Sequence, residues 1–262
     1  TAPGSPKREE IRQPDSRFKV VAYDYGIKKN ILRLLTEYGC DVQVVPATMS
    51  ADDVLALDPD GIFLSNGPGD PAACDYAVEN VRNLLGKRPM FGICLGQQIM
   101  SLAFGAKTYK LKFGHRGGNQ PVQVTESGAV QISSHNHGFA VDATSLPDGV
   151  KMSHVNLNDN CCEGIDAPSY KAFAVQYHPE SSPGPHDSDE LFARFITMME
   201  EVAKVVANSN SGWVVVEVEM KSACNHCDSS DSCGTSAVAK AFSPKVQRFS
   251  IQTERAFATG ER

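Results

Sequence analysis

A cysteine stands out in this sequence because its local setting suits nucleophilic chemistry. Cys94 lies in the string FGICLGQQ, between a predicted strand and a predicted helix, and Gly92 and Gly96 allow the tight turn required there. A thiol at a helix N-terminus feels the positive end of the helix dipole, which favours the nucleophilic thiolate. The string therefore indicates a nucleophile elbow with sulfur in place of oxygen. The alternative is a cysteine that only packs.

A histidine and a glutamate at the end of another predicted strand could complete such a site. A cysteine nucleophile needs a base, and the base needs an acid that orients it. The string YHPE supplies His178 and Glu180 at the end of the predicted strand 172–180. Residues two apart on a strand point to the same face, so we expect these side chains to lie together. The alternative is a surface pair without a chemical role.

A glycine-rich loop follows a third predicted strand. The string SNGPGDP (65–71) contains Gly67 and Gly69, whose backbone N–H groups could stabilise an oxyanion. Sites in open parallel sheets lie at the carboxyl ends of the strands. We therefore expect this loop, Cys94 and His178 to meet at one edge of a sheet, although an ordinary loop is the alternative.

The elements that must position these residues follow a simple pattern. Apolar runs predict strands at 18–23, at 41–46, from 61 onward and at 89–93. Helical spacing predicts helices at 28–38, 50–57, 74–85 and 95–105, with Ser50 as an N-cap. Such alternation indicates a parallel sheet covered on both faces. From Lys107 onward, alternating polarity predicts antiparallel or edge strands at 109–113, 121–125, 129–134, 139–142 and 151–155.

The predicted fold class is α/β, with a mostly parallel open sheet, flanking helices and an added antiparallel sheet. A long amphipathic helix is predicted over 186–207, and a small β-rich, cysteine-containing segment follows it. We expect a polar tail at 1–17, a main domain at 18–202 and the small segment at 203–262. The length of 262 residues, about 1.7 times a typical domain, agrees with this division.

Composition excludes several classes of protein. The net charge of −6 argues against non-specific nucleic-acid binding. No apolar run approaches the roughly 20 residues that span a bilayer, and the polar N-terminal tail does not read as a signal peptide. The eight cysteines are unevenly spread, which is typical of a reducing compartment rather than a disulfide framework. These features predict a cytoplasmic protein.

Residues of about 18–200 resemble the class I glutamine amidotransferases and, more narrowly, the glutaminase half of the carbamoyl phosphate synthetase small subunit. FGICLG followed at a distance by HPE marks the superfamily. The narrower resemblance is carried by YDYGIKKNILR (23–33), SNGPGDP, KFGHRGGNQPV (112–122), HNHGFAV (135–141) and YHPESSPGPHD (177–187). His115 and Arg116, in the string KFGHRGGNQPV, are expected to shape a loop or a docking surface.

The resemblance implies a reaction. Cys94 attacks the side-chain amide of glutamine to give a thioester and ammonia, while His178 transfers the proton and Glu180 holds the imidazole. The same resemblance places oxyanion and glutamine-binding roles at Gly69 and Leu95, and at Gly67, Gln98, Asn136, Gly138 and Phe139. Glutaminase chemistry of this kind needs no metal or organic cofactor.

The resemblance also implies a partner. Ammonia would pass to a large, ATP-grasp synthetase subunit that makes carbamoyl phosphate for pyrimidine and arginine biosynthesis. Small subunits of this family normally carry an N-terminal domain before the glutaminase, whereas about 17 polar residues precede Phe18 here. That domain contributes to glutamine contacts and to docking, so we expect efficiency and partner binding to be affected.

The last 60 or so residues resemble a different family, the cysteine-rich N-terminal part of RseC/MucC-type proteins. The matching residues include Trp213, Cys224, Cys227 and Cys233. Three thiolates within ten positions suit an iron–sulfur cluster or zinc, a CxxC pair also suits a redox dithiol, and inert thiols are the third alternative. A natural fusion, a mispredicted gene and an artificial chimera all remain open. The alternative is accordingly that the chain is non-catalytic or chimeric and that its C-terminal cysteine cluster serves as an iron–sulfur or redox module.

Overall fold

The computed structural model describes residues 17–181, 185 and 187–210. The chain divides into two units, Thr1–Val202 and Ala203–Arg262. The described residues belong to the first unit, apart from residues 203–210, which complete its last helix. The predictions for the polar tail at 1–17, apart from its last residue, for Trp213 and for the cysteine cluster Cys224, Cys227 and Cys233 lie outside the described residues.

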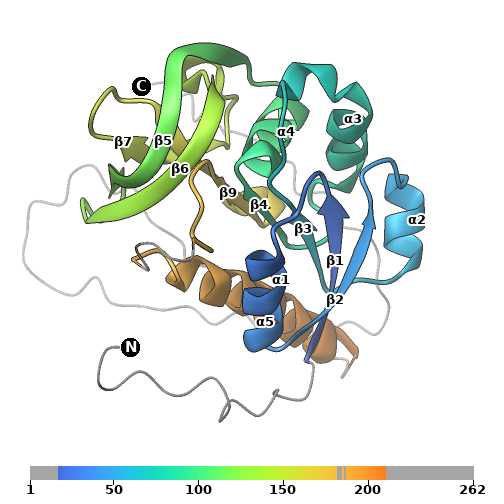
Figure 1. The fold of residues 1–262 in the computed structure, drawn as a ribbon. Coiled ribbons are helices and arrows are strands. Elements are labelled where there is room, and N and C mark those ends of the chain that lie inside the picture. The colour runs from blue at the N-terminus through green and yellow to red at the C-terminus, as the bar shows by residue number, and fades with distance from the viewer. Residues whose placement is uncertain (1–16, 182–184, 186, 211–262) are drawn as a thin grey trace, which may run out of the picture. The chain divides into compact units, whose positions relative to one another are not determined.

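Nine strands form one mixed sheet in the order β2-β1-β3-β4-β9-β8-β6-β5-β7 (Figure 1). The first five strands in this order are parallel. They are β2 (Cys40–Pro46), β1 (Phe18–Asp24), β3 (Gly61–Leu64), β4 (Met90–Ile93) and β9 (Ala172–Val175). Their carboxyl ends share one edge, as the alternation of strands and helices predicts.

The remaining four strands are antiparallel and continue the same sheet. They are β8 (Cys162–Ala167), β6 (Val130–Val141), β5 (Thr108–Val124) and β7 (Lys151–Asn156). Because β8 pairs with β9, this region is not a separate, added sheet as predicted. Strand β7 pairs with both β5 and β8, so these four strands form a closed ring of paired strands.

The predicted short strands between residues 109 and 142 are in fact two long ones. β5 and β6 pair along most of their lengths, with register shifts between Lys110 and His115 and between Gly117 and Gln120. Gly114 and Gly117 have positive φ angles of 71° and 105° at these shifts. The strand continues through the glycine-rich string because the extra residues are accommodated in such bulges. The glycine content of the string therefore wrongly indicated a loop.

Helices cover both faces of the parallel part of the sheet. α2 (Ala51–Ala56), α3 (Asp75–Leu84) and α4 (Leu95–Ala103) pack on one face, and α1 (Lys29–Glu37) and α5 (Glu190–Asn210) pack on the other (Figure 1). Three single 3₁₀ turns complete the described elements: η1 (Pro71–Ala73), η2 (Ala143–Ser145) and η3 (Pro168–Tyr170). As predicted, the Ser50 hydroxyl accepts from the N–H of Asp53 and caps α2.

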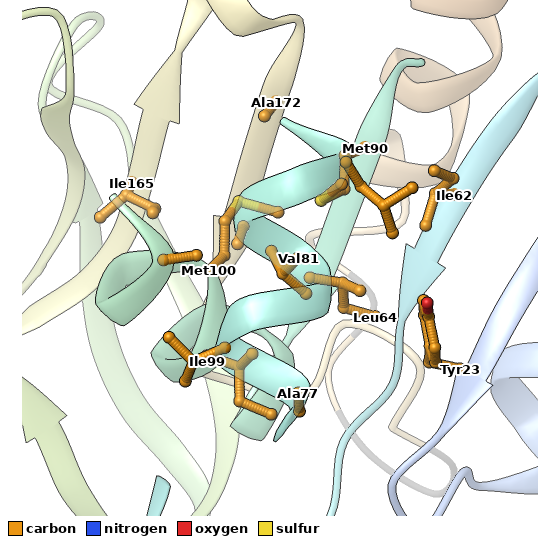
Figure 2. Packing of buried hydrophobic residues seen from close by; sticks show 14 of the residues in the cluster. Tyr23, Ile62, Leu64, Ala77, Val81, Met90, Ile99, Met100, Ile165 and Ala172 are labelled. Carbon is orange, nitrogen blue, oxygen red and sulfur yellow. The ribbon is translucent and has the colours of Figure 1, made fainter. Parts of the chain in front are cut away.

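Successive residues of the parallel strands bury their side chains on alternate faces of the sheet. In β1, Val21 and Tyr23 join the core under α2, α3 and α4, whereas Val20 and Ala22 join the core under α1 and α5. Figure 2 shows Leu64 lying beside Val81 in the first of these cores, with Tyr23 beyond Leu64. Burial on both faces explains the nearly continuous apolar runs of these strands. None of the helices between residues 17 and 210 combines the length and apolar character needed to cross a bilayer.

Candidate active site

Cys94 occupies the turn between β4 and α4. Its φ of 55° and ψ of −106° are rare for a residue with a side chain, and strain of this kind is typical of functional turns. The N–H of Cys94 donates to the carbonyl of Val175 at 2.8 Å, which ties the turn to the end of β9. The thiol is 4% exposed and stands at the N-cap of α4, where the helix dipole favours a negative charge.

Gly96 permits the close approach of α4 to β3 that this turn requires. A β-carbon at residue 96 would collide with the carbonyl oxygen and the side chain of Leu64. We therefore expect Gly96→Ala to lower the free energy of unfolding by about 1–3 kcal/mol, although alanine is the better helix former. Urea unfolding measures the change. Gly118→Ala is the control, because its nearest contact is Pro185 Cδ at 3.7 Å, and an equal loss in both variants would contradict the argument.

His178 and Glu180 meet through a turn rather than along a strand. β9 ends at Val175, and the N–H of His178 donates to Ser134 of β6 at 2.8 Å. The expected alternation along a strand is therefore wrong, although the two side chains do lie together. His178 Nδ1 lies 2.7 Å from Glu180 Oε1, and both side chains are buried. Pro179 between them has no N–H to continue a ladder, which accounts for the turn.

The electrostatics of the pair favour a charged imidazole. Burial by itself lowers the pKa of His178, but hydrogen bonds to Cys94 and Glu180 outweigh it and raise this pKa to about 9. Burial raises the pKa of Glu180, and the adjacent His178 and Lys28 outweigh it, so the net shift is downward. Since Nδ1 is engaged with Glu180, Nε2 is the nitrogen that remains for the thiol. Cys94, His178 and Glu180 thus form one hydrogen-bonded chain.

Two residues near the end of β1, for which the sequence had indicated no individual role, support this chain. Lys28 Nζ lies 3.3 Å from Glu180 Oε1 and 3.2 Å from His178 Nδ1. The Asn30 amide donates to the carbonyl oxygen of Glu180. A lysine just beyond the carboxyl end of a parallel strand was the available signal, because that edge also carries Cys94. The 150 positions that separate Lys28 from His178 concealed the contact.

The loop that follows β3 lies against the same edge. A β-carbon at Gly67 would collide with the carbonyl of Tyr25 and with Leu95, the residue after the nucleophile. The Asn66 side chain holds this loop by donating to Gly26 O at 3.1 Å. Leu95 is the first residue of α4, so its N–H has no acceptor within the helix. Gly69 is exposed, with a positive φ of 104°, farther along the loop.

The residues expected to bind substrate lie on α4 and β6. Gln98 Nε2 donates to the carbonyl of Phe139 and to Gln176 Oε1, each at 2.9 Å, and so links α4 to β6. Phe139 and Gly138 are partly exposed. Asn136 is exposed and lies opposite Arg116 of β5 in the strand register. The structure therefore brings Gln98 and Phe139 into contact and places Asn136 farther along the same strand.

Two family models match the chain. The model described as glutamine amidotransferase class-I matches residues 21–198, and the model of the positive regulator of sigma(E), RseC/MucC, matches residues 205–262. Both resemblances inferred from the sequence are thereby confirmed. The second match falls almost entirely outside the described residues, so the metal or redox role of its cysteines stays a prediction.

Curated relatives match the first region. The carbamoyl phosphate synthase small chain of Syntrophotalea carbinolica is 62% identical over 187 residues, covering 71% of this chain and 50% of the relative. The chloroplastic small chain of Oryza sativa is 60% identical over 188 residues, covering 72% of this chain and 42% of the relative. The chain thus spans about half the length of the curated relatives that it matches.

A solved structure resembles the fold. A protein from Thermoplasma acidophilum, described as a putative GMP synthase component, superposes with a TM-score of 0.60 at 23% identity, covering 72% of this chain and 97% of that one. At this level of identity, the likeness supports the fold alone.

Proposed function

Because this chain belongs to the class I glutamine amidotransferases, we propose that it hydrolyses the side-chain amide of L-glutamine. The observation that carries the proposal is the buried chain of hydrogen bonds from Cys94 through His178 to Glu180, at the carboxyl edge of the parallel strands. A nucleophile, a base and an orienting acid in contact are what acyl transfer requires. The non-catalytic alternative is not favoured, because all three groups are present and connected.

The first half of the proposed reaction forms a thioester. The thiol proton is held by His178, whose raised pKa keeps the imidazole charged, and the Cys94 thiolate attacks the amide carbon, so that a carbon–sulfur bond forms and an oxyanion develops. The N–H groups of Leu95 and Gly69 are the proposed donors to that oxyanion. The imidazolium then delivers its proton to the amide nitrogen, the carbon–nitrogen bond breaks, and ammonia leaves.

The second half regenerates the enzyme. Water gives a proton to His178 and attacks the thioester, and the carbon–sulfur bond breaks to release glutamate and restore the Cys94 thiolate beside the imidazolium of His178. Throughout, the negative charge of Glu180 stabilises the imidazolium, and Lys28 lies against the same carboxylate oxygen. Substrate contacts are proposed for Gly67, Gln98, Asn136, Gly138 and Phe139, and the reaction needs no metal or organic cofactor.

We also propose a destination for the ammonia. The relatives at 60–62% identity are named carbamoyl phosphate synthase small chains, which supports a partner of the ATP-grasp type, the large subunit. The pathway terms, pyrimidine and arginine biosynthesis, and a cytoplasmic location follow from that assignment and stay predictions.

The test measures ammonia release from glutamine by the purified chain, alone and with a carbamoyl phosphate synthase large subunit. Release by the chain alone would support the glutaminase, and stimulation with production of carbamoyl phosphate would support the partner. No release in either mixture from a folded chain would refute the proposal. Release without stimulation would refute only the partner.

The pH dependence of kcat/KM should show how Glu180 affects the pKa of His178. The pKa of His178 is raised to about 9, so the imidazole keeps its proton up to that pH and loses it above. Because protonated His178 assists the departure of ammonia, we expect kcat/KM to fall as the pH rises through about 9. Cys94 and Glu180 both raise this pKa, so Glu180→Gln removes one of the two contributions and should move the fall to lower pH.

The measurement is kcat/KM for glutamine from about pH 6 to about pH 10 in both proteins, a range that brackets the titration of the imidazole. Glu200→Gln is the control, since Glu200 pairs with Arg17 at an exposed position on α5. An alkaline limb at the same pH in wild type and Glu180→Gln would show that the carboxylate does not set the charge of His178.

A further inference from the structure

A second cluster of titratable side chains lies inside the antiparallel part of the sheet, outside the catalytic chain. His135 and His137 of β6, Glu163 of β8 and His115 of β5 each offer a ligand atom, and these four atoms lie within 4.8 Å of one another. His135, His137 and Glu163 are 3%, 5% and 0% exposed. The loop expected at His115 is wrong, and the alternative of a docking surface stays a prediction. His115 lies in β5 and bonds Glu163.

The hydrogen bonds around the two buried imidazoles place their protons away from the centre of the cluster. His137 Nδ1 lies 2.8 Å from the carbonyl of Phe139, which can only accept, so the proton is on Nδ1 and the lone pair on Nε2. The Ser133 hydroxyl donates to Gln120 O at 3.1 Å and therefore accepts from His135 Nε2 at 2.7 Å. This leaves a lone pair on His135 Nδ1, which faces His137 Nε2 at 3.1 Å.

Glu163 directs a third lone-pair atom to the same point. Its Oε1 accepts from His115 Nδ1 at 3.0 Å and from Asn156 Nδ2 at 3.1 Å. Its Oε2 is buried without a hydrogen-bond partner and lies 3.6 Å from His135 Nδ1 and 3.8 Å from His137 Nε2. These separations are too long for hydrogen bonds. Three electron-rich atoms therefore face one another in a buried space.

The spacing of the three atoms fits a metal ion. A triangle with sides of 3.1, 3.6 and 3.8 Å has a point about 2.0 Å from every corner. Bonds from zinc to imidazole nitrogen and carboxylate oxygen are about 2.0–2.2 Å. A metal at or slightly above that point would therefore reach all three atoms without movement of the side chains.

We propose that His135 Nδ1, His137 Nε2 and Glu163 Oε2 bind a divalent ion of the zinc type. Two imidazoles and a carboxylate form a recognised set for this ion, with a fourth position open to water. The hydrogen bonds of His137 to a carbonyl and of His135 to a hydroxyl are those that commonly orient metal-bound imidazoles. His115 is a positioning residue, because it holds Oε1 and leaves Oε2 free.

Two further features agree with the site. A pocket of about 370 Å³ is lined by His115, the positioning residue, together with Asp159 and Cys161. Within the described residues, β6 and β8 pair only at Val141 and Cys162, so the ion would add a crosslink between them.

The test uses the full chain with Cys224, Cys227 and Cys233 replaced by serine, which removes the C-terminal thiolates as competing ligands. The protein is treated with a chelator, and Zn²⁺ and Co²⁺ are then titrated separately. We expect one ion per chain, a higher unfolding temperature with Zn²⁺, and a Co²⁺ spectrum without a thiolate charge-transfer band. That spectrum distinguishes the site from the neighbouring set of His115, Asp159 and Cys161 and from Cys94.

Variants identify the ligands. His135→Gln and Glu163→Gln should abolish stoichiometric binding, and His115→Gln should weaken it by about 10–100-fold. His154→Gln is the matched control, because His154 is equally buried on β7 but bonds Ser153 outside the cluster. No stoichiometric binding, a thiolate band, or unchanged affinity in folded His135→Gln would each overturn the proposal. The Co²⁺ spectrum of the chain with intact ligands tests the proposed site even if a variant fails to fold. None of these measurements depends on glutaminase activity.

Discussion

Replacement of Cys94 by serine is expected to reduce glutamine hydrolysis by at least about a thousandfold while the protein stays folded. The substitution keeps the size of the side chain and the strained turn between β4 and α4. It removes the polarisable sulfur, whose thiolate is the attacking group, and a hydroxyl paired with the same imidazole is far less readily ionised. Ammonia release at saturating glutamine measures the loss, and circular dichroism with the urea midpoint checks the fold.

Cys74→Ser provides the matched control. Cys74 also precedes a helix directly, at the N-cap of α3, and Cys94 differs from it in its contact with His178. We expect activity close to that of the wild type in this variant. If Cys94→Ser kept most of its turnover, or if both serine variants lost activity equally, Cys94 would not be the nucleophile.

The second large effect is expected for His178→Asn. Asparagine retains a polar side chain but cannot take the thiol proton or return it to the leaving nitrogen, and general acid–base catalysis contributes about 10²–10⁴-fold. We expect a loss in that range, together with the disappearance of the fall in rate near pH 9 that the raised pKa of His178 produces. The kcat and kcat/KM values at several pH values measure both parts of the prediction.

His154→Asn is the control for the removal of a buried imidazole. His154 is 5% exposed, beside the 4% of His178, but it lies on β7 and bonds Ser153 rather than the catalytic chain. Its loss should affect stability more than turnover. Glutamine hydrolysis by His178→Asn at the wild-type rate, with an unaltered pH profile, would exclude His178 as the base.

Local patterns predicted the parallel half of the fold and pointed to the three residues that are proposed here as the reactive groups. The alternation of apolar runs with helical spacing gave the strands β1 to β4 and the helices α1 to α4, with ends that differ from the predicted ones by only a few residues. Cys94 was recognisable because the glycines and the strand–helix junction that position it are its own neighbours. His178 and Glu180 were recognisable because they lie two residues apart.

Only the tertiary structure decided which distant residues meet. It joined the antiparallel strands to the parallel sheet through β8 and β9, and it brought Lys28 to the carboxylate of Glu180. It also gathered His135, His137 and Glu163 around one buried point. A sequence determines spacing along the chain, and spacing specifies periodicity, caps and turns. Contacts between residues tens of positions apart depend on strand order and register, which the packing of the whole sheet selects.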